Sequence, residues 1–191
     1  MKIGLYFGSF NPVHTGHLII ANHVLEYTPV DRIWFVVSPQ NPLKESKSLL
    51  NEYHRLHLVN LAIENNPGFK GSNVEFSLPR PSYTIDTLTY LSEKYPKDEF
   101  SVIMGADSYC NITKWKNYVQ LLNQYQIIVY KRPGFEVNEA IPAKLTIVDA
   151  PLLEISATYI RDQLLQKKSI KYLVPEAVEE YIITNRYYTR H

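Results

Sequence analysis

Short apolar segments alternate with amphipathic segments along almost the whole chain, and this alternation restricts the fold more than any other feature. The apolar segments are predicted strands at residues 2–7, 32–38, 74–78, 100–104, 126–130 and 145–148. The amphipathic segments are predicted helices at residues 16–28, 56–63, 84–95, 117–123, 155–166 and 175–183. Strands that alternate with helices favour an α/β fold with a doubly wound, mainly parallel sheet and right-handed crossovers. The last two helices predict a C-terminal helical segment.

Length and composition are typical of one water-soluble globular domain. The chain has 191 residues, of which 45% are hydrophobic and 20% charged, so we expect a single domain over residues 1–191. The only cysteine, Cys110, cannot form an internal disulfide, and the residues after Lys2 lack the apolar stretch of a signal peptide. Both features indicate a cytoplasmic, reducing environment.

The charge balance limits the partners that we expect. The chain has 20 Lys and Arg residues against 19 Asp and Glu residues, which gives a formal net charge of +1. General nucleic-acid-binding proteins need a basic face that displaces phosphate counterions, and the apolar runs fall far short of the roughly 20 residues of a membrane helix. We therefore expect no nucleic-acid or membrane partner, and any binding of polyanions must depend on local positive charge.

The most informative motif lies between the first predicted strand and the first predicted helix. Residues 8–17 are Gly-Ser-Phe-Asn-Pro-Val-His-Thr-Gly-His. Ligands bind α/β sheets at the carboxyl ends of the strands, and a glycine and a serine there can bring backbone N–H groups close to a phosphate at a helix N-terminus. If Thr15 caps the helix, His14 and His17 both lie at its start and can donate to one phosphate.

Two other interpretations of His14 and His17 are open on the sequence alone. One is a metal site, although zinc usually takes three or four protein ligands and no cysteine is nearby. The other is a pair of capping or surface histidines without a function. The position directly after a strand, next to glycines, favours anion binding over both.

The motif in residues 8–17 resembles the signature of the nucleotidyltransferase superfamily that is marked by an H-x-G-H sequence. Gly-Ser-Phe-Asn-Pro followed by His-Thr-Gly-His is similar to bacterial nicotinate-nucleotide adenylyltransferases, and the resemblance extends over nearly the whole chain. It implies a Rossmann-like nucleotidyltransferase fold and catalytic roles for His14 and His17. The residues of this motif that it implies in ATP binding are Gly8, Ser9, Phe10 and Gly16.

Residues 81–88, Pro-Ser-Tyr-Thr-Ile-Asp-Thr-Leu, span the start of the third predicted helix. Ser82 or Thr84 can cap this helix, and the N–H groups of its first turn would hold a carboxylate or a phosphate. An ordinary N-cap without a ligand fits the local sequence equally well. The resemblance implies that the segment binds nicotinate mononucleotide, with Thr84 near the carboxylate of the pyridine ring.

Residues 105–116, Gly-Ala-Asp-Ser-Tyr-Cys-Asn-Ile-Thr-Lys-Trp-Lys, follow the fourth predicted strand. An aspartate at the tip of a parallel strand, here Asp107, can accept hydrogen bonds from ribose hydroxyls. Tryptophan is commonly a core residue, but the polar neighbours of Trp115 favour an exposed ring that can stack. The resemblance implies that Gly105 and Asp107 bind ATP. It implies that Trp115 stacks on the nicotinate ring, and we add Tyr109 to the predicted nicotinate mononucleotide site.

Residues 155–161, Ile-Ser-Ala-Thr-Tyr-Ile-Arg, begin another predicted helix. Ser156 or Thr158 would start it, and Arg161 adds a cationic fork one turn later, so this is a second anion-binding helix end. The resemblance implies that Ser156 and Thr158 bind the ATP polyphosphate and that Arg161 takes part in catalysis. Ala157 stands where the family commonly has serine, which removes one hydroxyl and leaves the backbone donors.

Two further cations follow predicted strands. Lys44, in the sequence Asn-Pro-Leu-Lys, is a point charge suited to a phosphate, and the resemblance implies a catalytic role for it. Asn41 and Leu43 depart from the better-known family pattern, which has proline and histidine there, and most loop lysines are only solvated. Arg132 lies in a Lys-Arg-Pro-Gly turn that also fits the family, and the sequence assigns it no firm role.

The resemblance implies that the phosphate of nicotinate mononucleotide attacks the α-phosphorus of ATP, which gives nicotinate adenine dinucleotide and pyrophosphate in NAD biosynthesis. The expected partners are these two nucleotides, and the expected cofactor is Mg²⁺ held mainly by the ATP phosphates. We predict no protein metal site, and a homo-oligomer is compatible with the sequence.

Two alternative functions are weighed against this one. The first is an enzyme like phosphopantetheine adenylyltransferase, whose chains are typically shorter and lack residues 81–88 combined with the later tryptophan. The second is a non-catalytic, nucleotide-binding regulatory domain. The presence of His14, His17 and Arg161 argues against the second, because a decayed site should have lost one of them.

Overall fold

The computed structural model describes residues 1–39 and 49–189. The strands are β1 (Lys2–Gly8), β2 (Arg32–Val37), β3 (Phe69–Ser72), β4 (Glu99–Gly105), β5 (Gln126–Tyr130) and β6 (Lys144–Val148). The α-helices are α1 (Thr15–Tyr27), α2 (Glu52–Ile63), α3 (Thr84–Lys94), α4 (Ala106–Tyr109), α5 (Tyr118–Gln124), α6 (Ala157–Leu165) and α7 (Glu176–Thr184). Two short 3-10 helices are η1 (Val74–Ser77) and η2 (Ile112–Lys114).

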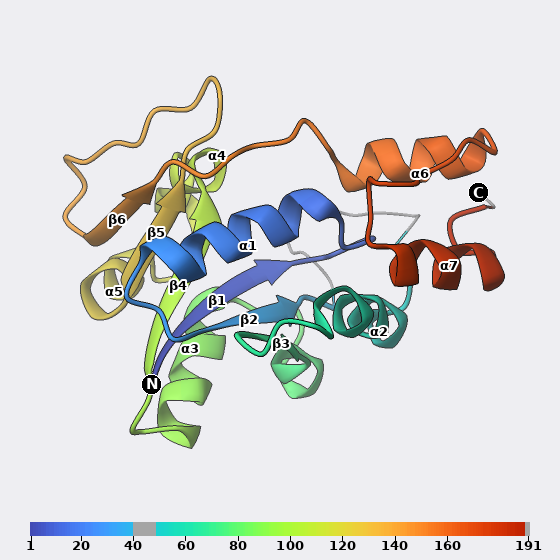
Figure 1. The fold of residues 1–191 in the computed structure, drawn as a ribbon. Coiled ribbons are helices and arrows are strands. Elements are labelled where there is room, and N and C mark those ends of the chain that lie inside the picture. Colours follow the sequence, from blue (N-terminus) through green and yellow to red (C-terminus); the bar gives the residue numbers. More distant parts are fainter. Residues whose placement is uncertain (40–48, 190–191) are drawn as a thin grey trace.

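All six strands form one parallel sheet in the order β3-β2-β1-β4-β5-β6 (Figure 1). At its centre, Leu5 of β1 lies opposite Trp34 of β2 and Val102 of β4. The chain runs outward from β1 through β2 to β3 and then returns to β4 on the other side of β1. The loops after β1 and β4 therefore flank the point where the strand order reverses, which is where such sheets bind ligands. This topology confirms the doubly wound α/β fold.

Helices cover both faces of the sheet. Neighbouring residues of a strand point to opposite faces, so they pack against different helices. Tyr6 and Phe35 pack with residues of α1, α2, α6 and α7 on one face. Leu5 and Trp34 pack with residues of α3, α4 and α5 on the other face. A parallel strand covered twice needs a continuous apolar run, which explains residues 33–37 of β2. Figure 1 shows α6 and α7 beyond the arrowheads of β1 and β2, which confirms the predicted C-terminal helical segment.

The predicted strand at residues 74–78 is wrong. The edge strand is β3, in which Phe69 pairs with Ile33 of β2, whereas residues 74–77 pair with none of the described strands and form η1. The sequence hides β3 because Phe69 is its only apolar residue. Its Gly71 allows close packing on α2, since a Cβ atom there would collide with Oδ1 of Asn60 unless that side chain moved.

The six predicted helices are present with shifted ends, whereas α4 and η2 were not predicted. Each of these two helices is too short to show a helical period in the sequence. They carry the chain from β4 to α5 and so shape the loop at the point where the strand order reverses.

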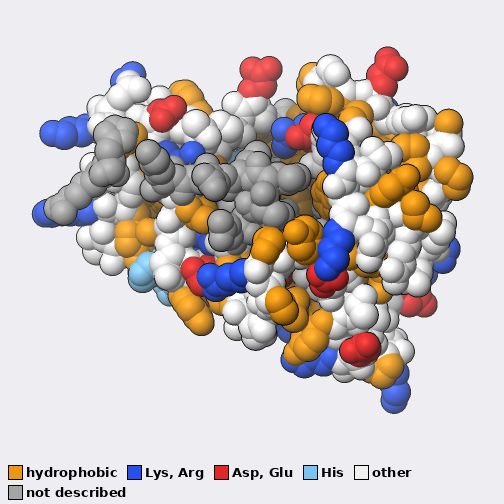
Figure 2. Space-filling model, turned by 180° about the vertical axis from the view of Figure 1, so that it is seen from behind, with side chains coloured by type: hydrophobic (Ala, Val, Ile, Leu, Met, Phe, Trp, Pro, Cys, Tyr) orange, Lys and Arg blue, Asp and Glu red, His pale blue; other side chains and the backbone are white. Residues whose placement is uncertain are grey.

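The surface shows mixed charge on the face opposite to that of Figure 1. Lysine and arginine side chains are interspersed there with aspartate and glutamate over the described part of that face (Figure 2). None of the described helices has the length and apolar character required to cross a bilayer.

Candidate active site

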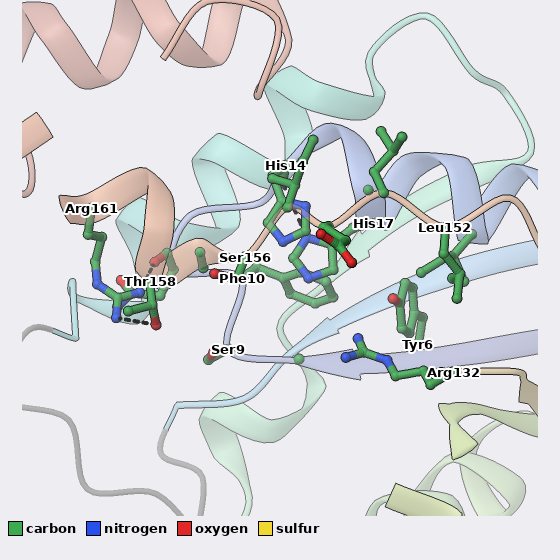
Figure 3. Close-up of a pocket in the computed structure, with 18 of the residues that line it drawn as sticks. Tyr6, Ser9, Phe10, His14, His17, Arg132, Leu152, Ser156, Thr158 and Arg161 are labelled. Carbon is green, nitrogen blue, oxygen red and sulfur yellow. Dashed lines mark hydrogen bonds between the residues drawn. The ribbon is translucent and has the colours of Figure 1, made fainter. Parts of the chain in front are cut away.

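A pocket of about 700 Å³ lies beyond the carboxyl ends of β1 and β5 (Figure 3). It is lined by the loop after β1 with the start of α1, by the turn after β5, and by the segment that leads into α6. The predicted site residues that line it are Gly8, Ser9, Phe10, His14, Gly16, His17, Ser156, Thr158 and Arg161. The fold therefore brings together the two helix starts that the sequence analysis identified as candidate anion sites.

His14 and His17 stack at the start of α1 with ring centroids 3.7 Å apart. The backbone N–H of His14 donates to Nδ1 of His17 at 3.2 Å. Since Nδ1 is an acceptor, the proton of the neutral His17 ring lies on Nε2. The predicted cap at Thr15 is wrong: His14 is the N-cap, because the N–H and Oγ1 of Thr15 donate to the carbonyls of Leu173 and Tyr172.

Both imidazoles are uncharged at pH 7. Burial, assisted by the charge of Arg132, lowers the pKa of His14 to about 4. Burial and then the neighbouring His14 and Arg132 hold the pKa of His17 well below its usual value. Bound phosphate would raise both pKa values, because a nearby negative charge favours the protonated ring.

We expect the free energy of unfolding to decrease when the pH is lowered from 7 to 5. The pKa of His14 is 6.5 in its ordinary state and about 4 in the folded protein, so the unfolded chain binds more protons in this range. The contribution of the uncharged His14 ring to the free energy of unfolding is present above pH 6.5 and is lost as the pH falls toward 4. By pH 5, His14 accounts for a loss of about 2 kcal/mol. Urea unfolding at pH 7 and at pH 5 measures the change in the free energy of unfolding. His14→Asn should show a weaker pH dependence, and an unchanged one would contradict the pKa of His14.

Phe10 covers the end of β1 and shapes the loop that follows it. Its backbone is left-handed, with φ of 44°, and its ring meets that of His17 edge-on at 5.1 Å. A Cβ atom on Gly8 would lie 2.8 Å from the Phe10 ring, and one on Gly16 would lie 3.1 Å from the His14 ring. Gly8 thus lets the Phe10 ring lie directly on the backbone, and Gly16 gives the His14 ring a close approach, a reason for the two glycines that the sequence did not reveal.

The start of α6 contributes hydroxyls and a guanidinium to the pocket. Ser156 is the N-cap and accepts a hydrogen bond from the N–H of Tyr159 at 3.1 Å, which confirms it as the start of this helix. Arg161 donates from Nη1 to the carbonyl of Asn11 at 2.7 Å and from Nη2 to Oγ1 of Thr158 at 3.1 Å. Arg161 therefore joins α6 to the loop after β1. Figure 3 shows this group on one side of the histidine pair and Arg132 on the other.

Arg132 is a candidate that the sequence analysis left without a role. It follows β5, lines the pocket, and its Nε lies 3.4 Å from Oδ1 of Asp107. Its guanidinium carbon lies 5.5 Å from the centre of the Tyr130 ring. Gly105 allows the ion pair, because a Cβ atom there would collide with Oδ1 of Asp107. Gly105 and Asp107 support Arg132 and are not among the residues that line the pocket. The available sequence signal was a cation just after a parallel strand.

The residues predicted to bind nicotinate mononucleotide are also outside this pocket. Thr84 is the first residue of α3, whose N-cap is Tyr83 with no side-chain hydrogen bond, so the predicted cap at Ser82 or Thr84 is wrong. Trp115 is half-buried beside the core. Tyr109 is fully buried in that core because α4 packs against the sheet, and the structure does not support its predicted contact with a ligand.

Glu75 explains why Ser82 does not cap α3. Its buried carboxylate accepts hydrogen bonds from Oγ of Ser82 and Oγ1 of Thr87, both at 2.9 Å. Burial raises the pKa of Glu75. These bonds hold the start of α3 against η1, so Glu75 is a site-supporting residue that sequence reasoning missed.

One catalytic candidate cannot be placed. Lys44, together with Asn41 and Leu43, lies outside the described residues, so its role stays a prediction. Within residues 1–39 and 49–189, no three His, Cys, Asp or Glu side chains come together in a way that could hold a metal ion.

Comparison with known proteins identifies the family. A family model described as cytidylyltransferase-like matches residues 5–163. A relative from Cytophaga hutchinsonii, named a probable nicotinate-nucleotide adenylyltransferase, is 54% identical over 100% of both chains. The nicotinate-nucleotide adenylyltransferase of Bacillus subtilis is 41% identical over 98% of both chains. The chain belongs to the nicotinate-nucleotide adenylyltransferase family.

The fold of the nicotinate-nucleotide adenylyltransferase family is also found among solved structures. The Plasmodium falciparum nicotinic acid mononucleotide adenylyltransferase complexed with NaAD matches with a TM-score of 0.82 at 22% identity, over 98% of this chain and 97% of that chain. Family membership confirms the predicted resemblance and the predicted enzyme class, a nucleotidyltransferase.

Proposed function

We propose that this chain joins ATP and nicotinate mononucleotide to give nicotinate adenine dinucleotide and pyrophosphate, as a step of NAD biosynthesis. The convergence of two stacked histidines, the start of α6 and two guanidinium groups on one pocket carries the proposal. The names of the relatives support the same acceptor. The proposal includes a single domain and a cytoplasmic location.

The groups in the pocket suit the polyphosphate of ATP. Arg161 and Arg132 supply positive charge, and Ser156 and Thr158 supply hydroxyls beside the positive end of the α6 dipole. Arginine forks bind phosphate oxygens with strong, charge-assisted hydrogen bonds. The ATP phosphates therefore lie between the start of α6 and the histidine pair, where Ala157 offers only backbone donors.

The reaction requires no covalent intermediate. A phosphate monoester is already a nucleophile, so the phosphate oxygen of nicotinate mononucleotide bonds to the α-phosphorus while the bond to the β-phosphate oxygen breaks. The protein aligns the two anions and stabilises the negative charge that develops on the α-phosphoryl and leaving oxygens. His14 and Nε2–H of His17 act as donors in this role, and Lys44 adds a point charge.

Mg²⁺ fits this site as an ion carried by ATP. Because the described residues offer no carboxylate cluster, phosphate oxygens and water would hold it. When bound, it neutralises part of the phosphate charge.

A preference for nicotinate over nicotinamide mononucleotide is expected from α3. Its N-cap Tyr83 makes no side-chain capping hydrogen bond, so, as far as residues 1–39 and 49–189 go, the first N–H groups of the helix are available to a ligand beside Thr84. Hydrogen bonds to an ionised carboxylate contribute about 1.5–3 kcal/mol each, which predicts a kcat/KM at least about tenfold higher for the acid than for the amide. Steady-state rates with the two acceptors measure the ratio, and equal values would remove this assignment.

Pyrophosphate release from ATP tests the proposed function. Release with nicotinate mononucleotide, but not without an acceptor, is the expected result. Release only with phosphopantetheine would favour the phosphopantetheine adenylyltransferase alternative. ATP binding with no release for any acceptor would favour a regulatory domain.

A further inference from the structure

Arg55 of α2 is fully buried, and its guanidinium binds backbone rather than acid. No carboxylate of residues 1–39 and 49–189 forms an ion pair with it. Its Nε donates to the carbonyl of Leu50 at 2.7 Å, and its Nη2 to that of Pro39 at 3.0 Å. Its Nη1 donates both to the carbonyl of Ser38 at 2.8 Å and to that of Ser9. These bonds engage the three nitrogens of the guanidinium.

The four carbonyls belong to three separate parts of the fold. Ser9 lies in the loop after β1, Ser38 and Pro39 follow β2, and Leu50 precedes α2. A guanidinium is a planar fork with five N–H donors, whereas a lysine ammonium is a point charge with three donors. Arg55 therefore fixes the ends of two neighbouring parallel strands relative to each other in a way that lysine cannot reproduce.

The bond to Ser9 also sets the direction of the next N–H group. In a planar trans peptide the carbonyl and the following N–H point in opposite directions, and the cis peptides of the structure lie elsewhere. Since the Ser9 carbonyl points at Arg55, the Phe10 N–H points away from Arg55. Both Ser9 and Phe10 line the pocket, and this N–H donates to no residue within the described ranges. Arg161 holds the carbonyl of Asn11 in the same loop.

We propose that Arg55 is a positioning residue for adenylyl transfer, because its grip on the Ser9 carbonyl aims the Phe10 N–H at a phosphate oxygen of the bound nucleotides. The proposal rests on the proposed function. Arg55 itself touches no substrate, and it acts through the peptide between Ser9 and Phe10.

Arg55→Lys tests the proposal by steady-state kinetics. The lysine keeps the charge but loses the fork, so the Ser9 peptide is free to rotate. A misplacement of about 1 Å can cost 100-fold in rate. We therefore expect kcat to fall about 10- to 100-fold, with a smaller change in KM for ATP and in KM for nicotinate mononucleotide. Arg55→Met removes all four bonds and should lower kcat at least as much. If Arg55→Met does not fold, Arg55→Lys decides alone.

The amide signal of Phe10 provides a readout that does not depend on turnover. In ¹H–¹⁵N spectra we expect a downfield shift of this signal when a non-hydrolysable ATP analogue binds the wild-type protein. Arg55→Lys should bind the analogue with a reduced shift at saturation. A full shift in Arg55→Lys, or no shift in the wild-type protein, would contradict the proposal.

Leu121→Ala is the control for general loss of stability. Leu121 is buried on the other face of the sheet, in α5, and its truncation should lower the Tm without lowering kcat at a temperature where the protein is folded. If the wild-type enzyme is active and folded Arg55→Lys has the same kcat, the positioning role of Arg55 is overturned. An inactive wild-type protein would instead reject the proposed function.

Discussion

His17→Ala is expected to lower kcat by two to three orders of magnitude while the protein remains folded. Nε2–H of His17 is a fixed donor in the pocket where the phosphoryl group would react, and loss of one such donor costs about 2.7–4 kcal/mol in the transition state. The effect should appear in kcat more than in KM, because the charge develops only during transfer. Pyrophosphate release at saturating ATP and nicotinate mononucleotide measures it.

His17→Asn separates the donor from the structural role of the ring. The asparagine Oδ1 can accept the hydrogen bond from the His14 N–H as Nδ1 does, but nothing replaces Nε2. We expect a Tm close to that of the wild-type protein and a kcat as low as that of His17→Ala. His23→Ala is a matched control on the same helix, because His23 stacks on Tyr27 and does not line the pocket. Normal turnover by His17→Asn would remove His17 from catalysis.

Arg161→Ala is expected to reduce kcat/KM for ATP by about one to two orders of magnitude. A hydrogen bond between charged groups contributes about 1.5–3 kcal/mol, and the variant also loses the bond that joins α6 to the carbonyl of Asn11. Both losses weaken the binding of the ATP polyphosphate at the start of α6. We therefore expect KM for ATP to rise while KM for nicotinate mononucleotide changes little, as measured by varying each substrate in turn.

Arg161→Lys tests whether the fork or the charge matters. Lysine keeps the charge but cannot reproduce the two separate bonds from Nη1 and Nη2, so we expect a kcat/KM between those of the wild-type and Arg161→Ala proteins. Lys168→Ala, just beyond α6, removes an exposed cation that does not line the pocket and should have no effect. A wild-type KM for ATP in Arg161→Ala would show that Arg161 does not bind the polyphosphate.

Much of the fold could be predicted from the sequence, because the relevant signals are local. The run at residues 33–37 is apolar throughout because β2 is covered on both faces, and that alone indicates a central parallel strand. The edge strand β3 could not be predicted, since its place depends on pairing with β2 and on packing of Gly71 against α2. The positions of His14, His17 and Arg161 at the starts of α1 and α6 were predictable, because the residues that begin each helix are recognisable in the local sequence.

The supporting residues were not predictable, because their partners are distant in sequence. Arg55 binds a carbonyl 46 residues away, and Arg161 one 150 residues away. Glu75 lies in a segment that was predicted as a strand, and its bonds to Ser82 and Thr87 form only in the folded chain. Tyr109 shows the reverse error, since a residue in a family motif is fully buried in the core.

Local sequence patterns specify the architecture and the chemical groups of the candidate site, because strand and helix periodicity and loop composition are properties of neighbouring residues. The orientation of those groups depends instead on contacts between distant segments of the folded chain. The donor nitrogen of His17 depends on the backbone of His14, and the direction of the Phe10 N–H depends on a buried guanidinium from another helix. Such orientations are fixed by hydrogen bonds that form only when separate segments meet, so local sequence patterns do not contain them.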